Sequence, residues 1–491
     1  MPVVVKIPEK VKAGGAKGHC YKESFKANRT NELIVMNQEN VGAEVQGELF
    51  KRRRSEIPDA ERLSELQEKL YQKAKQERGY KFYVLYDKMF VPYILREAWK
   101  HVKANDGAPG VDGITVAEVE SYGIEKYLKE LGEDLRKQTY QPQAVKRVMI
   151  LKSNGGERPL GIPTVRDRIA QTVCKMILEP IFEADFEESS YGFRPKRSSK
   201  DAMAAIKEHL KQGKTEVYDA DLSKYFDTIP HDKLQIALKQ RIADPRILKL
   251  LNKWLKVSVY EDGQYKSGKG NRTGTPQGGV ISPLLANIYF HLLDKIVNAT
   301  QSLFGQYGIR IVRYADDFVL MGKTLPIQII EKLKSLLQRM GLNLNEEKTR
   351  LIDARKESFN FLGFTIRYDK DIKGRNTRYW NIMPSKKSEQ KIRDKVKEYL
   401  KAHGHYNAQE VATGLNTIMR GWLNYFEIKG ISYPAMSKRR LRVYLSESIY
   451  RYYNRKSQRK CRLYGQKAFE VLVTKFGLID PSKYVYLSAR L

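Results

Sequence analysis

The stretch "IRIVRYADDFVLMG", residues 309–322, places two adjacent carboxylates between two runs that are otherwise typical of buried strands. β-Branched and aromatic residues alternate on both sides of Asp316 and Asp317, as expected for two strands joined by a tight turn. Burying one unpaired carboxylate is unfavourable, and a second beside it adds repulsion. We therefore expect a cation at this turn, with a divalent metal as the first candidate. The alternative is an ordinary Asp-rich turn without chemistry.

The chain also carries a strong positive charge. Its 491 residues contain 89 Lys and Arg against 57 Asp and Glu, a formal net charge of +32. A field of this sign attracts polyanions, so nucleic acid is the expected partner. The sequence contains no run of about 18 apolar residues that would span a membrane. The three cysteines, Cys20, Cys174 and Cys461, are too widely spaced for a thiolate metal site, so we expect oxygen ligands in a cytoplasmic protein without a membrane partner.

Composition divides the chain into four parts. Residues 1–58 are predicted to form a basic flexible leader, and residues 59–365 mix helical and strand patterns. Residues 366–430 and 431–491 are predicted to be helical and basic. From residue 386 onward, 23 Lys and Arg face 8 Asp and Glu, a net charge of +15. The fold class is therefore predicted to be α+β, followed by a helical region with a strongly basic end.

A second acidic site lies in "TEVYDADLSKYFDTIPH". Strand alternation places Asp219 and Asp221 on one face, and one of them is expected to meet Asp316 across adjacent strands. Three converging carboxylates suit two Mg²⁺ ions and phosphoryl transfer. The alternative is an acidic cluster paired with Arg313 or Lys224.

These two sites belong to a longer series of motifs. "RYADDFVLM" resembles the YxDD motif of reverse transcriptases, and "DLSKYFDTIPH" resembles their first palm motif. The series continues, in family order and spacing, with "GAPGVDGIT" (107–115), "ERPLGIPTVRDRIAQ" (157–171), "YGFRPKRSS" (191–199), "GTPQGGVISPLLANIYF" (274–290), "LNEEKTRL" (344–351), "FLGF" (361–364) and "GWLNYF" (421–426). This wording resembles that of group II intron-encoded reverse transcriptases.

The resemblance implies a right-hand polymerase. Fingers and a palm with an antiparallel sheet are expected over residues 59–365, an α-helical thumb or maturase (X) domain over 366–430, and a DNA-binding segment over 431–491. The implied activity is that of an RNA-directed DNA polymerase using dNTPs, a primer and a DNA target. The implied biological role is to bind the intron RNA, assist splicing as a maturase, and copy the intron during retrohoming by target-primed reverse transcription.

The resemblance also implies roles for single residues. Asp221, Asp316 and Asp317 are the implied catalytic residues and ligands of two Mg²⁺ ions, which selects Asp221 over Asp219. The implied dNTP-binding residues are Lys152, Arg158, Phe226, Gln277 and Lys348. Among these, Phe226 would exclude a ribose 2′-OH.

Some of these residues have simpler interpretations. The loop from Lys152 to Arg158 is alternatively a basic hairpin that touches template, and "PQGG" around Gln277 is alternatively a plain turn. Lys348 has Glu346 and Glu347 as alternative partners. Ser282 is predicted to be the N-cap of the apolar helix that follows.

A nucleic-acid surface is predicted in residues 431–462, where ten Lys and Arg against one acid alternate with tyrosines. The predicted contacts are Arg194, Lys438, Arg439, Arg440, Arg442, Arg451, Tyr452 and Tyr453. Trp422, Tyr425 and Phe426 have i, i+3, i+4 spacing and are instead expected in a helical core.

The series departs from larger family members in one respect. Many of them carry an HNH endonuclease with Cys pairs and His ligands, whereas this sequence has only Cys461 after Phe426 and no histidine after His405. We therefore expect a bacterial, group IIC-like protein without that domain, associated with the nucleoid. The alternatives are a domesticated reverse transcriptase in DNA repair, defence or CRISPR adaptation, and a polymerase-inactive RNA-binding splicing cofactor. The sequence leaves monomer and dimer equally open.

Overall fold

The structure is a computed structural model that describes residues 57–151, 156–371, 376–455, 463 and 465–485. Contacts divide the chain into residues 1–57 and 58–491, and the second unit is described below. The predicted leader up to residue 56 and the predicted site residue Lys152 lie outside the described residues. No helix in the described ranges is long and apolar enough to cross a membrane.

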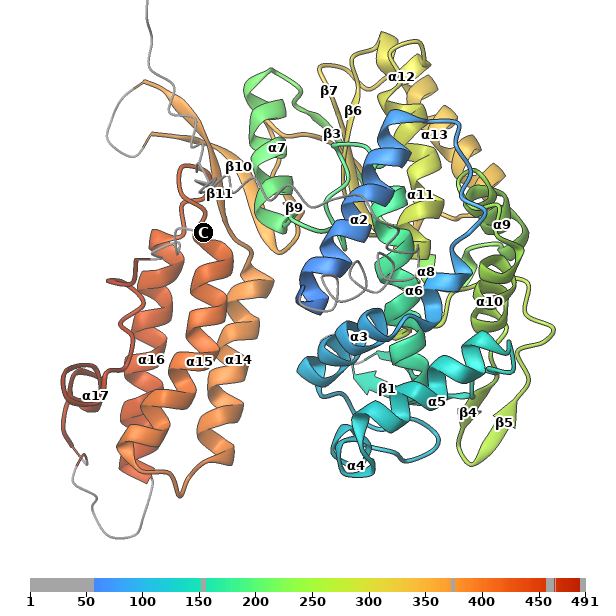
Figure 1. The fold of residues 1–491 in the computed structure, drawn as a ribbon. Helices are drawn as coiled ribbons and strands as arrows, with labels where there is room; N and C mark the ends of the chain where they lie inside the picture. The colour runs from blue at the N-terminus through green and yellow to red at the C-terminus, as the bar shows by residue number, and fades with distance from the viewer. Residues whose placement is uncertain (1–56, 152–155, 372–375, 456–462, 464, 486–491) are drawn as a thin grey trace, which may run out of the picture. The chain divides into compact units, whose positions relative to one another are not determined.

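The N-terminal part of this unit is a group of helices beside a small sheet (Figure 1). Its helices are α2 (Asp59–Gln76), the 3₁₀ helix η1 (Tyr86–Phe90), α3 (Pro92–Asn105), α4 (Val116–Tyr122), α5 (Ile124–Arg136) and α6 (Val165–Glu183). Its sheet has the order β2-β1-β4-β5 and contains β1 (Val145–Leu151), β2 (Glu157–Ile162), β4 (Val259–Glu261) and β5 (Gln264–Lys266). β1 pairs antiparallel with β2 and parallel with β4, so residues far apart in sequence share this sheet.

A four-stranded antiparallel sheet lies at the centre, in the order β6-β7-β3-β8. Its strands are β3 (Glu216–Ala220), β6 (Arg310–Tyr314), β7 (Asp317–Gly322) and β8 (Arg350–Asp353). The surrounding helices are α7 (Ser199–Lys211), α8 (Tyr225–Thr228), α9 (His231–Lys239), α10 (Pro245–Leu255), α11 (Ser282–Asn298), α12 (Leu303–Gln306) and α13 (Ile327–Met340).

Both faces of the central sheet are covered, which explains its nearly continuous apolar strands. Tyr218 and Leu320 belong to the core that contains residues of α6, α11 and α13. Their strand neighbours Val217 and Val319 belong to a second core with residues of α7. The alternation of the strands therefore sorts neighbouring residues into two cores, and the mixture of helix and sheet agrees with the predicted α+β class.

The C-terminal part begins with an antiparallel sheet in the order β11-β10-β9 and continues as a helical bundle (Figure 1). Its elements are β9 (Phe359–Phe361), β10 (Phe364–Lys370), β11 (Arg378–Pro384), α14 (Lys386–Ala402), α15 (Ala408–Phe426), α16 (Ala435–Arg455) and α17 (Ala468–Phe476). Val396 of α14, Leu415 of α15 and Leu445 of α16 share one core. The domain boundary predicted at residue 430 therefore falls inside a single packed bundle.

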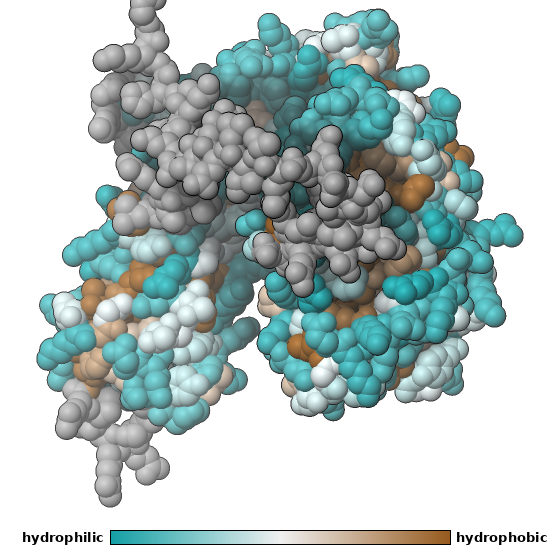
Figure 2. Space-filling model, viewed as in Figure 1, coloured by the Kyte–Doolittle hydropathy of each residue, from teal (hydrophilic) through white to brown (hydrophobic). Residues whose placement is uncertain are grey.

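The face of the molecule in Figure 2 is mostly hydrophilic, with hydrophobic residues in separate patches. This surface agrees with the large positive charge of the sequence, since charged side chains remain in water unless they are paired.

Candidate active site

The predicted hairpin is present, and it carries the two adjacent aspartates at its turn. Tyr314 of β6 pairs with Asp317 of β7, which leaves Ala315 and Asp316 as the connection. Ala315 has a φ of 60°, in the left-handed region that non-glycine residues seldom adopt. Such a backbone persists only where its surroundings hold it in place.

A buried arginine holds this turn from below. Arg313 is 0 % exposed, and its guanidinium donates to the Ala315 carbonyl at 2.9 Å. It also donates to Asp294 Oδ2 at 2.6 Å, to Asn287 Oδ1 at 2.9 Å and to Ser190 Oγ at 2.6 Å. Arg313 therefore forms its salt bridge with Asp294. It does not pair directly with the acidic cluster, as the alternative interpretation would require.

The "YGFRP" motif supplies a second support for the turn. A Cβ added at Gly192 would lie 2.3 Å from the Ala315 nitrogen, so only glycine fits against the turn there. The Gly192 carbonyl accepts a hydrogen bond from Asn287 Nδ2 at 2.8 Å. Asn287 therefore joins the "YGFRP" motif to Arg313 and, through it, to the aspartate turn.

The third predicted carboxylate, Asp221, follows β3, which pairs with β7. Its carbonyl accepts from Asn345 N at 2.8 Å, and its side chain lies 3.3 Å from Lys348 Nζ. Lys348 therefore contacts a predicted catalytic residue, while its alternative partner Glu346 pairs with Lys334. The first palm motif and "LNEEKTRL" thus meet at one end of the central sheet.

The aspartates at this end of the sheet repel one another. The pKa of Asp317 is raised to about 7. The largest cause is burial by surrounding protein atoms, followed by the charges of Asp316, Asp221 and Asp219. Part of the Asp317 side chain nevertheless reaches solvent. Burial raises the pKa of Asp316, and burial with the charge of Asp221 raises the pKa of Asp219 to about 6. Lys348 opposes the shift at Asp317 without cancelling it.

These carboxylates do not form a closed cage. Among the described residues, no three His, Cys, Asp or Glu side chains converge as a ready set of metal ligands. Their chemistry nevertheless fits a hard divalent cation, because carboxylate oxygens are its preferred ligands and the cluster has excess negative charge.

The predicted nucleotide-side residues also come together. Arg158 lies on β2, and its Nε donates to Gln277 Oε1 at 3.0 Å. Gln277 Nε2 donates to both carboxylate oxygens of Asp227 at 3.0 Å. Asp227 follows Phe226, which is half-buried, and the Phe226 carbonyl accepts from Thr275 N at 2.7 Å. The geometry thus brings together three of the predicted dNTP-binding residues around α8 and β2.

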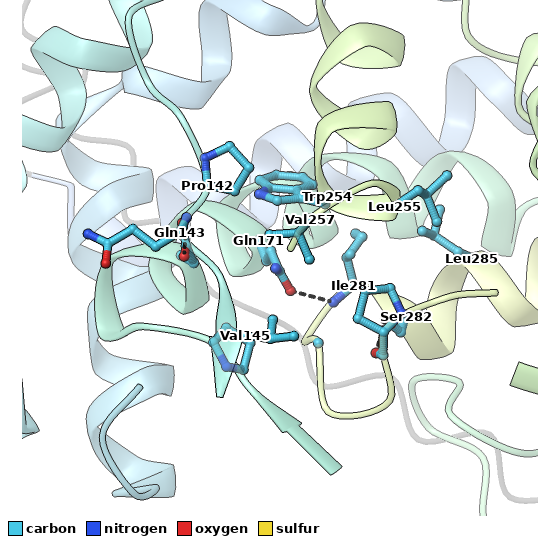
Figure 3. Close-up of a pocket in the computed structure, with 14 residues that line it drawn as sticks. Pro142, Gln143, Val145, Gln171, Trp254, Leu255, Val257, Ile281, Ser282 and Leu285 are labelled. Atoms are coloured by element: carbon cyan, nitrogen blue, oxygen red, sulfur yellow. Dashed lines mark hydrogen bonds between the residues drawn. The ribbon is translucent and has the colours of Figure 1, made fainter. Parts of the chain in front are cut away.

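The loop before α11 presents Gln277 on a fixed backbone. The Gln277 carbonyl accepts from Gly161 N at 2.6 Å, and Ile281 N donates to Gln171 Oε1 at 3.5 Å (Figure 3). Beneath the loop lies a small apolar pocket, which Figure 3 shows lined by Val145, Trp254, Leu255, Val257 and Leu285 among others. The "PQGG" stretch is therefore a packed loop held by β2 and α6.

Ser282 has a different role from the one predicted. It is the first residue of α11, and Ile281 occupies the cap position without a side-chain hydrogen bond. The prediction of Ser282 as the N-cap is therefore wrong. The Ser282 hydroxyl donates instead to the Pro276 carbonyl at 2.8 Å, which braces the loop beside Gln277.

The "FLGF" and "GWLNYF" motifs pack against each other. The ring of Phe364 lies 4.8 Å from that of Phe426 and 5.7 Å from that of Tyr425. Phe426 is buried and Trp422 is half-buried, as expected for core residues, whereas Tyr425 remains 37 % exposed and donates to the Leu362 carbonyl.

The predicted nucleic-acid residues divide into two groups. Arg194, Lys438 and Tyr453 are buried, and Arg194 binds Glu183 while Lys438 binds Glu427. Their surroundings favour a structural role. The remaining five reach the surface. Three of them form ion pairs there: Arg440 with Glu389, Arg442 with Asp480, and Arg451 with Glu447. Tyr452 donates to the His403 carbonyl, and Arg439 is exposed.

Comparison with known proteins accounts for this arrangement. Residues 150–366 match the family described as "Reverse transcriptase (RNA-dependent DNA polymerase)", and residues 389–467 match "Group II intron, maturase-specific domain". Protein YkfC of Escherichia coli (strain K12) is 35% identical over 340 residues, which cover 62% of this chain and 88% of that protein. The chain belongs to the group II intron-encoded reverse transcriptases.

Two further relatives cover different shares. The group II intron-encoded protein LtrA of Lactococcus lactis subsp. cremoris is 32% identical over 344 residues, 58% of this chain and 56% of LtrA. Maturase-like protein 1 of Euglena gracilis is 25% identical, and the match covers 72% of each chain. This group II intron-encoded reverse transcriptase thus spans little more than half of LtrA.

Family membership makes the chain an RNA-directed DNA polymerase with a maturase domain. Sequence motifs alone do not reveal the role of two residues that support this arrangement. Arg313 is an arginine inside a strand, which is a signal for a buried ion pair. Asp227 is marked only by its place directly after Phe226.

Proposed function

We propose that Asp221, Asp316 and Asp317 hold two Mg²⁺ ions and catalyse addition of dNTPs to a primer 3′ end. The observation that carries this proposal is the meeting of two distant acidic motifs at one end of the central sheet, where burial and then the charges of the neighbouring aspartates raise the pKa of Asp317 to about 7. Divalent ions would relieve this repulsion, and two of them at one site suit phosphodiester formation.

In this reaction the primer 3′ oxygen forms a bond to the α-phosphorus of the dNTP, the bond to pyrophosphate breaks, and the 3′ proton passes to solvent. Bound Mg²⁺ would activate the attacking oxygen and neutralise charge on the leaving group. Asp316 is held for this role by the turn above Arg313, and Asp221 is held by Lys348. Arg158 and Lys152 would contact the triphosphate, and Lys348 the departing pyrophosphate.

The half-buried ring of Phe226 would select deoxyribonucleotides. It packs against the core below, so the ring is held at the edge of the site. A ribose 2′-OH placed against this ring would meet carbon without a hydrogen-bond partner. Gln277, presented by its packed loop, would contact the nascent base pair.

We further propose that the chain binds its intron RNA, assists splicing, and copies the intron by target-primed reverse transcription at a DNA target. The match of residues 389–467 to the maturase-specific domain supports this role, as does the +15 charge from residue 386 onward. Association with the nucleoid and the group IIC-like grouping belong to the same proposal. Neutralising several phosphates predicts a steep fall of RNA affinity with salt.

Primer extension on an RNA template tests the catalytic proposal. With Mg²⁺, the unchanged protein should incorporate dNTPs and not rNTPs, and Asp316→Ala/Asp317→Ala should lower the rate by at least about a thousandfold. The matched control is Glu346→Ala/Glu347→Ala, which removes the same charge from exposed residues nearby. Extension by the Asp double variant would contradict the metal assignment. Absence of extension by clean, RNA-binding protein would favour the splicing-cofactor alternative.

A further inference from the structure

Asp227 contacts the proposed nucleotide site without belonging to the set of residues assigned to it above. Its two carboxylate oxygens accept from Gln277 Nε2 at 3.0 Å each, and Gln277 Oε1 accepts from Arg158 Nε at 3.0 Å. These hydrogen bonds form a continuous chain of side chains from β2, through the loop before α11, to α8.

The two neighbours allow only one orientation of the Gln277 amide. A guanidinium can only donate hydrogen bonds, and an ionised carboxylate can only accept them. With its oxygen toward Arg158 and its nitrogen toward Asp227, the Gln277 amide satisfies both neighbours. The flipped amide would place a donor against the Arg158 donor and an acceptor against the Asp227 acceptors. The orientation is therefore set by chemistry and not by the shape of the amide, which is nearly symmetric.

The backbone around Asp227 is built to hold this contact. Thr275 N donates to the Phe226 carbonyl at 2.7 Å, and Gly274 N donates to the Ile229 carbonyl at 2.8 Å. A Cβ at Gly274 would lie 3.0 Å from the Asp227 carbonyl oxygen, so the loop and α8 pack backbone to backbone. Gly161 N holds the other side of the loop through the Gln277 carbonyl at 2.6 Å.

We propose that Asp227 is a positioning residue that orients the Gln277 amide and, through it, holds Arg158 for the incoming nucleotide. This inference rests on the proposed function, because Arg158 and Gln277 matter to catalysis only if a dNTP binds beside Phe226. Asp227 itself does not touch the nucleotide in this scheme.

Electrostatics alone and positioning by Asp227 predict opposite changes in dNTP affinity when Asp227 is replaced by asparagine. An exposed carboxylate close to a triphosphate site repels the ligand, so its removal should strengthen dNTP binding or leave it unchanged. Positioning requires that Asp227→Asn weakens dNTP binding, since the asparagine no longer fixes the amide orientation.

The experiment measures dNTP binding without chemistry. The full chain is assembled with an RNA template and a DNA primer ending in a dideoxynucleotide, and the complementary dNTP is titrated with Mg²⁺ while a heparin challenge reports the stabilised complex. Asp227→Asn should require about tenfold more dNTP. Asp232→Asn is the matched control, because Asp232 is exposed on the neighbouring helix α9 and the change removes the same charge.

A double-mutant cycle separates positioning from a general effect. If Asp227 acts through Gln277, Asp227→Asn should have little further effect in a Gln277→Ala background. An equal effect in both backgrounds, or Asp227→Asn binding dNTP as well as Asp232→Asn does, would overturn the inference and leave the proposed function intact. Failure of the unchanged protein to form any dNTP-dependent complex would overturn the proposed function and this inference together.

Discussion

The aspartate turn and the basic helix α16 are both rich in charge, but they hold it in different ways. Under the turn, Arg313 and Asp294 are each 0 % exposed and fully hydrogen-bonded. On α16, cations such as Arg439 and Arg451 lie at the surface, and Lys438 is the only Lys or Arg side chain of this helix that is buried. The charge under the turn is therefore enclosed and has buried partners, whereas most of the positive charge on α16 lies at the surface, where ion pairs such as that of Arg451 with Glu447 are exposed to water.

This difference has energetic consequences. Breaking a buried ion pair strands a charge in a poorly solvated place, whereas removing an exposed charge changes stability little. The same substitution should therefore change stability much more under the turn than on the surface of α16.

The largest effect is expected at the turn. Arg313→Met leaves Asp294 buried without its partner and removes the support of the Ala315 carbonyl. The free energy of unfolding should fall by about 3–5 kcal/mol, as it does when one partner of a buried pair is removed. Urea denaturation followed by circular dichroism measures this change.

The double variant Arg313→Met/Asp294→Leu is the control for the cause. If the stranded charge dominates, the second substitution should recover a large part of the lost stability. Primer extension should stay impaired, because the turn still lacks its hydrogen-bond donor. Arg313→Met protein as stable as the unchanged chain would refute the account of an enclosed, partner-dependent turn.

A pH-dependent effect of intermediate size is expected from His291, on the same helix as Asp294. Burial lowers the pKa of His291 to about 4, with help from the charge of Lys295. Between the ordinary pKa near ~6.5 and the lowered value, the unfolded chain binds more protons than the folded chain. The free energy of unfolding should therefore fall as the pH falls through this range, by up to about 3 kcal/mol.

Substitution isolates this contribution from that of the carboxylates. His291→Gln should lose less stability than the unchanged protein between pH 7 and pH ~4.5, since glutamine takes up no proton. His405→Gln, on an exposed loop of the bundle, should retain the acid sensitivity of the unchanged chain. Equal acid sensitivity in the His291 variant and the unchanged protein would show that His291 is not the buried base described above.

The same contrast explains how much the sequence could predict. Strand alternation around Asp316 and Asp317 was sufficient for the hairpin, because each side chain's face follows from its parity in the strand. The motif series placed Arg158 and Gln277 near each other. It could not pair Arg313 with Asp294, because that contact depends on how α11 packs under the sheet, and sequence proximity to the acids suggested a different partner.

Charge composition was a weaker guide on α16. It assigned Lys438 and Arg439 the same role, although Lys438 is in step with the buried residues Leu441 and Leu445 at i+3 and i+7. That spacing predicts burial for Lys438, and its partner Glu427 lies on a different segment of the chain. Helical phase, rather than residue type, separates structural from exposed cations in this region.

The smallest effects are expected from these two neighbours, and they test the contrast most finely. Lys438→Met removes a cation that lies 3.1 Å from Glu427 and is 7 % exposed, so the free energy of unfolding should fall by about 1–2 kcal/mol. Arg439→Met should change it by no more than about 0.5 kcal/mol. Both variants lose one positive charge, so net charge is matched.

RNA binding should show the reverse order. Arg439→Met should lower the slope of log affinity against log salt by about one, since an exposed cation can neutralise a phosphate directly. Lys438→Met should leave the slope nearly unchanged once folded protein is measured, because its ammonium group already binds Glu427. If both variants lower the slope of log affinity against log salt equally, the overall electrostatic field of the bundle governs RNA binding. The exposure of single cations would then not matter, and the difference between buried and exposed cations on α16 would have no consequence for RNA binding.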